Sequence, residues 1–509
     1  MSLIANGAGE SAKNFYNDVA TQSARFDRPS DGILTRTVGT AGNRRTWTFS
    51  TWLKRSGIGT HQYIFGTNVS SNDATSANFH FNSSDKIVIQ PWSNTFAGTS
   101  AVFRDTSAWY HVVVDFDTTQ AGSGNSSRVN IYVNGVDQVL VNGGATLSQN
   151  SEWAINLDQA GTQVSGLYGD ANEFDGYLAE TNFVDGLSLD ASYFGETKGG
   201  VWIPKTADVS NYGTNGFRLK YDQVGVGTAS TSTIGADTSG KTNHFTSSGI
   251  VASDCAMPDS PENNFCTINS NIRSTGTVTE SKGNLRSTQE GSTSTYLGGT
   301  IPFRSGKWWM EVRVLAFNDN FAPSLVRADI LEVSSTGNDI DLFNAAPGAI
   351  GMYQNGAALV NGTNIGDGTF APNGHDGNDV GDVIGVAVDL DAGTPNIKYF
   401  LDGTQTSIVQ EIPANMVNTD LVFACLQYNG GTLHFNWGQD STFGGGETAT
   451  SNADENGFGA FHHAPPSGYL ALCTANLPEP TIGPNSDTQA SDHFNTLLYT
   501  GNSTDDRAI

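Results

Sequence analysis

The sequence has few basic residues. Its 509 residues include 25 Lys and Arg against 51 Asp and Glu, which gives a formal net charge of −26, although only 15% of the residues are charged. The surface is therefore acidic mainly because bases are scarce, and Ser, Thr, Asn and Gly fill the polar positions. Such a surface repels phosphate backbones and anionic membranes. We expect no nucleic acid among the partners.

Long apolar runs, cysteine motifs and secretion signals are also missing. No stretch approaches the roughly 18 consecutive apolar residues of a membrane span, so no membrane insertion is expected. The N-terminus shows no basic segment followed by an apolar core, and we therefore expect no Sec signal. Cys255, Cys266, Cys425 and Cys473 form no CxxC pair and no zinc spacing. Free buried thiols are favoured over a Cys255–Cys266 disulfide, and synthesis in a cytoplasm is expected.

Helical periodicity is almost absent, and this indicates an all-β protein. The chain contains 59 glycines and many short runs rich in β-branched and aromatic residues. In "TWTFSTWLK", alternation places Trp47 and Leu53 on one face and Trp52 on the other. Both faces carry a tryptophan, so this strand is expected to be covered on both sides. The length predicts two or three domains.

One hairpin pattern occurs twice. "NIYVNGVDQ" at 130–138 and "KYFLDGTQT" at 398–406 each join an apolar run to Asn-Gly or Asp-Gly and then to a polar exit. These dipeptides suit a type I′ turn because both of its central residues need a positive φ. The repeat predicts a similar pair of strands in each half of the chain.

The motifs around the first hairpin occur in a fixed order. They are "SARFDRPSDGILTRT", "TWTFSTWLKRS", "AWYHVVVDFD", "VNIYVNGV" and "FDGYLAETNFVDGLSLDASYFGE". In this order they resemble the laminin-G-like (LamG) branch of the concanavalin A-like superfamily. The motifs around the second hairpin are "SGKWWMEVRV", "AIGMYQNG", "GDVIGVAVDLDAG", "IKYFLDG" and "LHFNWGQDSTF", and they resemble a SPRY domain.

The resemblance implies two concanavalin A-like jelly-roll β-sandwiches in tandem. The expected organisation is an N-terminal arm at 1–22, a LamG-like jelly roll at 23–221, a Gly/Ser/Thr-rich linker at 222–283, a SPRY-like jelly roll at 284–477 and an extended C-terminal tail at 478–509. The linker sequence is also compatible with a segment that wraps on a neighbouring surface.

The segment between the jelly rolls and the tail extend the resemblance to nearly the whole chain. With them the sequence resembles LamG–SPRY structural proteins of tailed bacteriophages, especially marine ones. This implies a non-enzymatic virion appendage, a tail or head fibre component, that attaches to host-surface glycans. The alternative is a capsid or tail decoration or assembly protein that binds only other virion proteins. A polysaccharide-degrading enzyme is disfavoured.

The same resemblance implies partners and a location. We expect contacts with other virion proteins through the N-terminal arm, contact with host-surface carbohydrate, and a homo-oligomer, with a trimer favoured. The protein would lie on the virion surface after synthesis in the host cytoplasm and release by lysis. Lytic release also accounts for the lack of a signal sequence.

Catalytic motifs are poorly represented. Glucanases of the superfamily carry three carboxylates on one strand, spaced so that they share a face. The nearest match, "EFDGYLAE", offers Glu173, Asp175 and Glu180, but Glu180 has the opposite parity. One bulge leaves the third group about two residues too far along. No nucleophile elbow, HExxH or P-loop motif occurs either.

Exposed aromatic residues beside amides are the candidates for sugar contact. Such sites stack the apolar face of a sugar on a ring and bind its hydroxyls with polar side chains. "QPWSNTFAG" offers Trp92, Asn94 and Phe96 in a predicted loop, and Tyr353 and Tyr428 are similar candidates in the second half. For each aromatic residue, a partly buried rim position is the alternative.

One glycine-rich loop concentrates oxygen ligands. "GHDGNDVGD" at 374–382 contains Asp376, Asn378 and Asp379, which could ligate Ca²⁺. The loop lacks the EF-hand spacing and leads directly into an expected strand, so a solvated polar loop is favoured. We assign no metal and no cofactor, and Ca²⁺ stays an open alternative.

Overall fold

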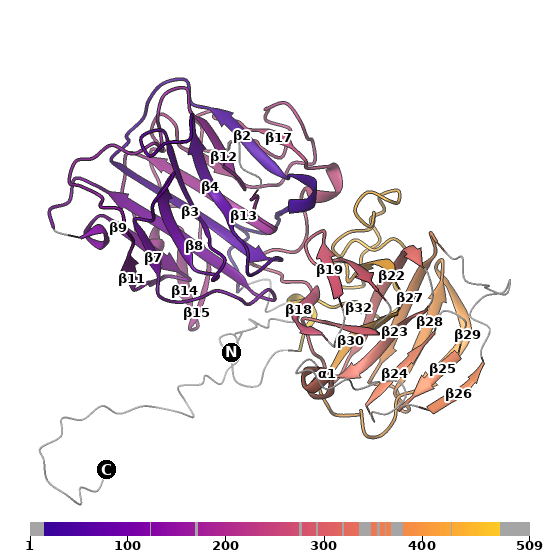
Figure 1. Ribbon diagram of the computed structural model, residues 1–509. Helices are drawn as coiled ribbons and strands as arrows, with labels where there is room; N and C mark the ends of the chain where they lie inside the picture. Colours follow the sequence, from indigo (N-terminus) through magenta and orange to yellow (C-terminus); the bar gives the residue numbers. More distant parts are fainter. Residues whose placement is uncertain are drawn as a thin grey trace, which may run out of the picture.

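Two β-sandwiches lie side by side in the chain (Figure 1). The first, the N-terminal sandwich, contains the strands up to residue 248, and the second, the C-terminal sandwich, contains those from residue 268 onward. The predicted all-β fold with tandem sandwiches is confirmed. The computed structural model describes residues 15–122, 124–167, 172–273, 277–291, 294–317, 320–334, 348–353, 357–361, 363–367, 380–428 and 430–478.

Two antiparallel sheets form the N-terminal sandwich. We name them after a central strand of each. The β3 sheet runs in the order β1 (Ala24–Phe26), β13 (Gly176–Asp185), β3 (Thr46–Arg55), β8 (Trp109–Asp117), β9 (Val129–Val133) and β10 (Val136–Asp137), and β16 (Phe217–Leu219) also pairs with β13. The β6 sheet runs in the order β11 (Leu140–Asn142), β7 (Ala97–Thr99), β6 (Ile87–Pro91), β5 (Ser76–Phe81), β4 (Gln62–Asn68), β12 (Gly161–Val164), β2 (Ile33–Thr37) and β17 (Thr246–Ser248).

The C-terminal sandwich repeats this plan. Its first sheet runs in the order β18 (Ile268–Arg273), β21 (Thr295–Gly299), β30 (Leu421–Tyr428), β23 (Asn320–Arg327), β24 (Ala349–Met352), β25 (Ala357–Val360) and β26 (Thr363–Asp367). Its second runs in the order β19 (Thr277–Ser281), β20 (Arg286–Glu290), β31 (Gly431–Asn436), β22 (Lys307–Phe317), β27 (Val383–Asp389), β28 (Asn396–Leu401) and β29 (Thr404–Glu411), and β32 (Leu470–Ala471) also pairs with β22.

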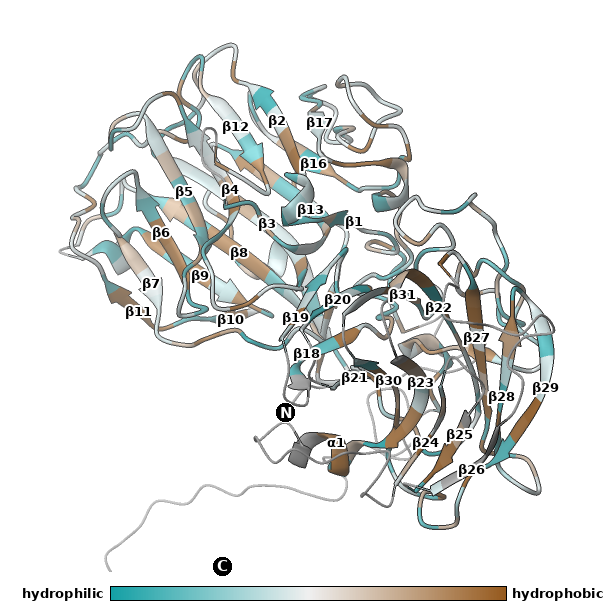
Figure 2. Cartoon of the chain, turned by 45° about the vertical axis from the view of Figure 1, so that its right-hand side comes forward, coloured by the Kyte–Doolittle hydropathy of each residue, from teal (hydrophilic) through white to brown (hydrophobic). Residues whose placement is uncertain are grey.

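Helix is limited in the described residues to α1 (Ala328–Ser334) and short 3₁₀ turns. No helix in these parts of the chain is long and apolar enough to cross a membrane. The strands of both sandwiches carry most of the hydrophobic residues, coloured brown, and the loops are mainly white to teal (Figure 2). The four cysteines are free and buried, as predicted.

Strand β3 is buried on both faces, which confirms its reading from the sequence. On the inner face, Trp47 stacks with Phe116 at a ring-centroid distance of 4.7 Å and with Trp153 at 5.8 Å. On the outer face, Trp52 is only 4% exposed and packs in a separate cluster with Tyr177. Both faces of this sheet are thus withdrawn from solvent along β3.

A stack of three rings closes the outer face of the β3 sheet. His111 stacks with Trp52 on one side, at 4.7 Å, and with Trp202 on the other, at 6.0 Å. Trp202 comes from β15 (Val201–Pro204), which pairs with β14 (Gly195–Lys198). Its Nε1 donates to Nδ1 of His111 at 3.0 Å, so the ring proton of His111 lies on Nε2, 2.9 Å from Ser50 Oγ.

Both predicted hairpin turns are confirmed. Asn134 and Gly135 have φ values of 50° and 77° between β9 and β10, and Asp402 and Gly403 have 45° and 77° between β28 and β29. Two successive positive φ values are what a type I′ turn requires.

Within residues 222–283, the described parts, 222–273 and 277–283, lie against both sandwiches. Strand β17 pairs with β2 and becomes the edge strand of the β6 sheet. Strands β18 and β19 belong to the two sheets of the C-terminal sandwich. Several large apolar side chains of this stretch are buried as well: Ile234, Phe245 and Ile250 pack in the core of the first sandwich, and Ile268 packs in that of the second. This stretch is therefore integrated both by backbone pairing and by a small number of core residues.

Buried ion pairs hold the two sandwiches together. The fully buried guanidinium of Arg25, on β1, pairs with Asp254 at 2.8 Å and with Asp440, beyond β31, at 3.0 Å. Lys54, on β3 and 1% exposed, pairs with Asp259 at 2.9 Å and also donates to the backbone oxygen of Phe265. Arg25 and Lys54, both on the first sandwich, thus bind segments of the connection and of the second sandwich.

Replacing Arg25 by Met tests this junction. The change leaves Asp254 and Asp440 buried without their cation, and we expect a loss of about 3–5 kcal/mol in the free energy of unfolding. Arg45→Met is the matched control, because Arg45 is 45% exposed in its pair with Glu152 and should contribute at most about 1 kcal/mol. Urea unfolding of the full chain measures both. Equal losses for the two variants would contradict a stabilising role of the junction.

Acid should destabilise the fold through its buried histidines. Burial lowers the pKa of His80, His111 and His434 from 6.5 to about 3. The unfolded chain therefore binds protons below pH 6.5 that the folded chain does not, so stability is complete above pH 6.5 and is lost as the pH falls. At about pH 4.5 each histidine should cost about 2–3 kcal/mol.

The measurement is urea unfolding of the full chain between neutral pH and about pH 4.5. His111→Gln should lower stability at neutral pH, because it removes the ring stack, yet flatten the dependence on pH. His61→Gln is the control: His61 is exposed, and although it stacks on His80 its charge is only the lesser cause of the lowered pKa of His80, after burial, so the slope should stay nearly unchanged. An unaltered slope for His111→Gln would refute the assignment.

Candidate functional site

The carboxylates considered for glycoside hydrolysis do not form a catalytic set. Strand β13 has a bulge between Ala179 and Asn182, and Glu180 at this bulge has a φ of 45°. The carboxylate of Glu180 is buried and pairs with Arg218 at 2.5 Å. Burial raises the pKa of Glu180, and the positive charge of Arg218 opposes the rise. Glu180 is thus committed to an ion pair.

Asp175, which precedes β13, lies in different surroundings. Burial and the nearby charge of Asp27 raise the pKa of Asp175 to about 7. Glu173 is 7% exposed. Glu173 and Glu180 are therefore buried and Asp175 is half-buried, whereas a glycosidase needs its acid and its nucleophile facing a bound sugar.

Metal ligands are not gathered in the parts of the chain that the structure describes. No group of three or more His, Cys, Asp or Glu side chains is placed there to hold an ion. Asp376, Asn378 and Asp379 lie outside the described residues. The calcium alternative stays a prediction.

A shallow polar groove lies on the outer face of the β6 sheet. Its volume is about 480 Å³, and it extends over the turn between β5 and β6, the strands β6 and β7, and the residues at and after β11. Val88 lines it, whereas Ile87 and Ile89 point into the core, as alternation along β6 requires. Its polar side chains are Asn82, Ser93, Asn94, Thr95 and Asn142, and its one ionisable side chain is Lys86. Thr99 also borders the groove, but it is 1% exposed and its hydroxyl donates to the carbonyl of Ala101.

The loop between β6 and β7 forms one wall of this groove. Asp73, from the loop after β4, accepts hydrogen bonds from the backbone N–H and the hydroxyl of Ser93, at 2.8 and 2.9 Å. At its other end the loop is anchored by Phe96, which is 8% exposed and packs 5.7 Å from Trp153. The wall is thus fixed at both ends.

Gly143 allows the opposite wall of the groove to lie close to the loop between β6 and β7. The N–H of Gly143 donates to the carbonyl of Phe96 at 2.8 Å, and a Cβ at Gly143 would lie 2.0 Å from the carbonyl oxygen of Thr95. A Cβ at Gly98, on the floor, would lie 3.2 Å from a methyl group of Val88. The groove keeps its width because these positions carry no side chain.

The structure separates the residues that the sequence grouped as glycan contacts. Asn94 is exposed and lines the groove, and Trp92 is 36% exposed in the same loop but does not line it. The assignment of Phe96 as a glycan contact has to be corrected. Phe96 is a core residue, because its ring packs beside Trp153. Tyr353 and Tyr428 are half-buried in the C-terminal sandwich, so they share no site with Asn94.

Several residues of the groove were missed by sequence reasoning. Asn142 and Thr99 come from neighbouring strands, β11 and β7, that pair through Leu140 and Thr99. The sequence around Asn142 contains no aromatic residue to draw attention, and beside Thr99 attention went to Phe96. The Gly143-Gly144 pair directly after a short β-branched run was the available signal, because such a pair marks a close backbone approach.

Comparison with known proteins identifies the first part of the chain. Residues 27–189 match the model of a family described as the concanavalin A-like lectin/glucanases superfamily. The chain carries a concanavalin A-like domain. The groove lies within the matched residues, and so do the three carboxylates. No curated protein matches the chain.

Solved structures are similar to the chain in part. They include the SPRY domain of human HERC1 (12% identity, TM-score 0.25, covering 34% of this chain and 97% of that one) and the TRIM65 PSpry domain (15%, 0.25, 33% and 89%). A third is the native heptameric SAP-like pentraxin from Limulus polyphemus (16%, 0.24, 33% and 76%).

Two neighbouring glycines of the concanavalin A-like domain give a matched test of the groove. Gly143→Ala should push the 93–96 loop outward, because its Cβ would clash with the carbonyl of Thr95, and should cost about 1–3 kcal/mol. Gly144→Ala meets only Asn94 Oδ1, at 3.9 Å, and should change stability by less than about 0.5 kcal/mol. Urea unfolding compares them, and equal midpoints would contradict the close approach.

Proposed function

We propose that this protein is a non-enzymatic carbohydrate-binding protein, and that the groove on the β6 sheet is its contact surface. One observation carries the proposal: the groove is lined by the amide or hydroxyl side chains of five residues outside the core (Asn82, Ser93, Asn94, Thr95 and Asn142), by no carboxylate, and by one cation, Lys86. Neutral donors and acceptors suit the hydroxyl groups of a sugar, which present both functions. The concanavalin A-like lectin/glucanase description of residues 27–189 supports it.

The sheet that carries the groove is the one that can be reached. The outer face of the β3 sheet is filled by Trp52, His111 and Trp202, so a ligand finds no free surface there. The buried carboxylates at β13 support a binding role over hydrolysis, because Glu180 is tied to Arg218.

We further propose that the glycan-binding protein is an appendage of a tailed-phage virion, such as a tail or head fibre component. The motif order of both halves supports this assignment, since it resembles LamG–SPRY virion proteins. The buried junction around Arg25 supports it as well, because a joined pair of sandwiches suits an external adhesin. Host attachment would then follow from binding of surface glycans.

One observation favours assembly with other virion proteins as a second candidate. Val136, Val139 and Val141 are 62%, 73% and 56% exposed along the chain that passes from β10 to β11. Both strands are edge strands of their sheets, and exposed apolar edges are sites of protein association. A decoration or assembly protein would use this edge.

A glycan array probed with the full chain separates the two functions. We expect retention on surface polysaccharides without release of reducing ends. Asn142→Ala should weaken retention about two- to tenfold, because it removes a side chain that lines the groove. Val139→Ser should leave retention unchanged, since Val139 does not line the groove.

The outcomes divide clearly. Absence of any retained glycan would refute carbohydrate binding, and release of reducing ends would refute the non-enzymatic assignment. Loss of particle incorporation in Val139→Ser, with no glycan retained by the parent chain, would favour the assembly role.

A further inference from the structure

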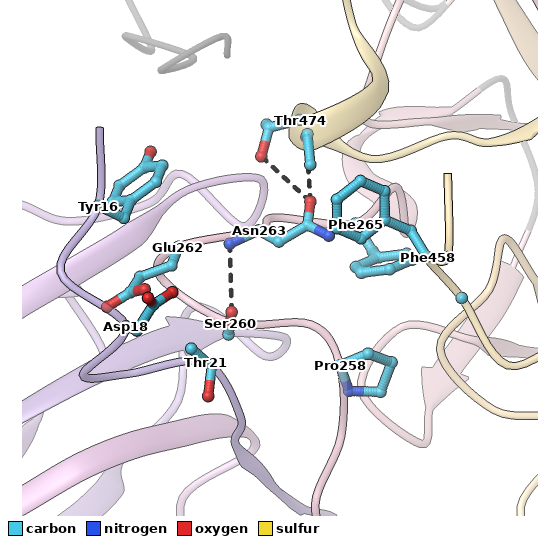
Figure 3. Close-up of a pocket in the computed structure, with 13 residues that line it drawn as sticks. Tyr16, Asp18, Thr21, Pro258, Ser260, Glu262, Asn263, Phe265, Phe458 and Thr474 are labelled. Atoms are coloured by element: carbon cyan, nitrogen blue, oxygen red, sulfur yellow. Dashed lines mark hydrogen bonds between the residues drawn. The ribbon is translucent and has the colours of Figure 1, made fainter. Parts of the chain in front are cut away.

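A second cavity lies at the junction of the two sandwiches, apart from the groove. Its volume is about 290 Å³, and thirteen residues line it (Figure 3). They come from three stretches of the chain that are distant in sequence: residues 16–21 before β1, residues 258–265 before β18, and residues 457–475 around β32. The cavity is at the small end of the range for ligand pockets, about 300–1,000 Å³.

Hydrogen bonds fix each wall of this junction pocket. Oε1 of Glu262 accepts the backbone N–H groups of Val19 and Ala20, at 2.8 and 2.9 Å, and so ties the first stretch to the second. Oδ1 of Asn263 accepts the N–H of Ala475 at 3.1 Å, which ties the second stretch to the third. The pocket is therefore preformed, and a ligand need not order its walls.

The pocket has an acidic side and an apolar side. In Figure 3 the carboxyl groups of Asp18 and Glu262 lie side by side, and Pro258, Phe265 and Phe458 lie across the opening from them. None of the thirteen lining residues is basic. The buried carboxylate of Glu262 and the exposed carboxylate of Asp18 thus border the pocket without a cation in its lining.

The electrostatics of Glu262 agree with this asymmetry. Burial raises the pKa of Glu262, and the negative charge of Asp18 raises it further. The hydrogen bonds that the Glu262 carboxylate accepts from the backbone N–H groups of Val19 and Ala20 oppose the rise. Two like charges beside a partly apolar cavity repel one another, and a bound cation would relieve that repulsion. Burial also raises the pKa of Tyr16, so its phenol stays neutral at the rim.

We propose that the junction pocket binds a primary ammonium group carried on an apolar stem. The ammonium would lie against Asp18 and Glu262, and the stem would pack against Phe458 and Pro258. The volume suits one such stem, and the aromatic rings favour a cation with an apolar body. A lysine side chain of a partner polypeptide and a free alkylamine share this chemistry. The site is independent of the glycan groove.

Calorimetric titration of the full chain with three probes tests the proposal. n-Pentylamine and N-acetyl-lysine-N-methylamide carry the ammonium on an apolar stem, and 1-pentanol is the neutral control. We expect binding of at least one amine with a stoichiometry of one, and binding of pentanol at least about tenfold weaker. If the lysine derivative binds more strongly than pentylamine, the natural ligand is a lysine side chain of a partner polypeptide. If pentylamine binds and the lysine derivative does not, the natural ligand is a free alkylamine.

Conservative variants locate the site. Glu262→Gln keeps an oxygen for the N–H groups of Val19 and Ala20 but removes the charge, and should weaken amine binding about tenfold. Asp18→Asn should act alike, because Asn tolerates the φ of 55° at this position. Asp158→Asn, at an exposed carboxylate of the N-terminal sandwich, is the control and should bind like the parent.

Two results would overturn the proposal. One is equal affinity for pentylamine and pentanol, or no binding of either amine. The other is unchanged amine binding in both Glu262→Gln and Asp18→Asn, with thermal unfolding like that of the parent. Because no probe is a sugar, failure here leaves the glycan groove unaffected, and failure on the glycan array leaves this pocket unaffected.

Discussion

The architecture depends on two cations that are buried where the sandwiches meet. Arg25 and Lys54 lie on neighbouring parts of the β3 sheet, and each is almost fully withdrawn from solvent. A buried cation is tolerated only with partners in good geometry, and these partners come from outside the sheet. The first sandwich is therefore chemically incomplete without residues 254–265 and 440. Independent domains on a flexible tether would not share such groups.

This junction also decides where ligands have access. Lys54 donates a hydrogen bond to the backbone carbonyl of Phe265, and Phe265 lines the junction pocket. The buried Lys54 therefore helps to position one wall of that cavity. The outer face of the β3 sheet is closed by the ring stack at His111. The β6 sheet stays open, and its groove lies far along the sheet from β2 and β17, which lie at the opposite edge. The two proposed ligand sites thus lie away from the outer face of the β3 sheet, one on the β6 sheet and one at the seam between the sandwiches.

Local patterns allowed much of the fold to be predicted. Alternation in β3, the Asn-Gly and Asp-Gly turns and the absence of helical periodicity each depend on residues close in sequence, and the structure confirms them. Phe96 shows the limit, because an aromatic residue in a loop has the same local pattern whether it turns inward or outward. The pairing of Arg25 with Asp440 spans 415 residues, and no local pattern reports it. Of the groove, only Asn94 was named from the sequence; the residues of β7 and β11 were missed for the same reason, since these strands meet only in the folded chain.

The pairing of Arg25 has a consequence for the time course of synthesis. Asp440 follows Asp254 by 186 residues, so at a translation rate of roughly 5–20 residues per second it emerges roughly 10–40 s later. During that interval the guanidinium of Arg25 has only the carboxylate of Asp254 as a partner. The surface of the first sandwich around Arg25 then lacks the residues that bury it in the complete chain. A nascent chain in this state favours closure by its own second half over association with a neighbour, because the missing anion arrives on the same polypeptide.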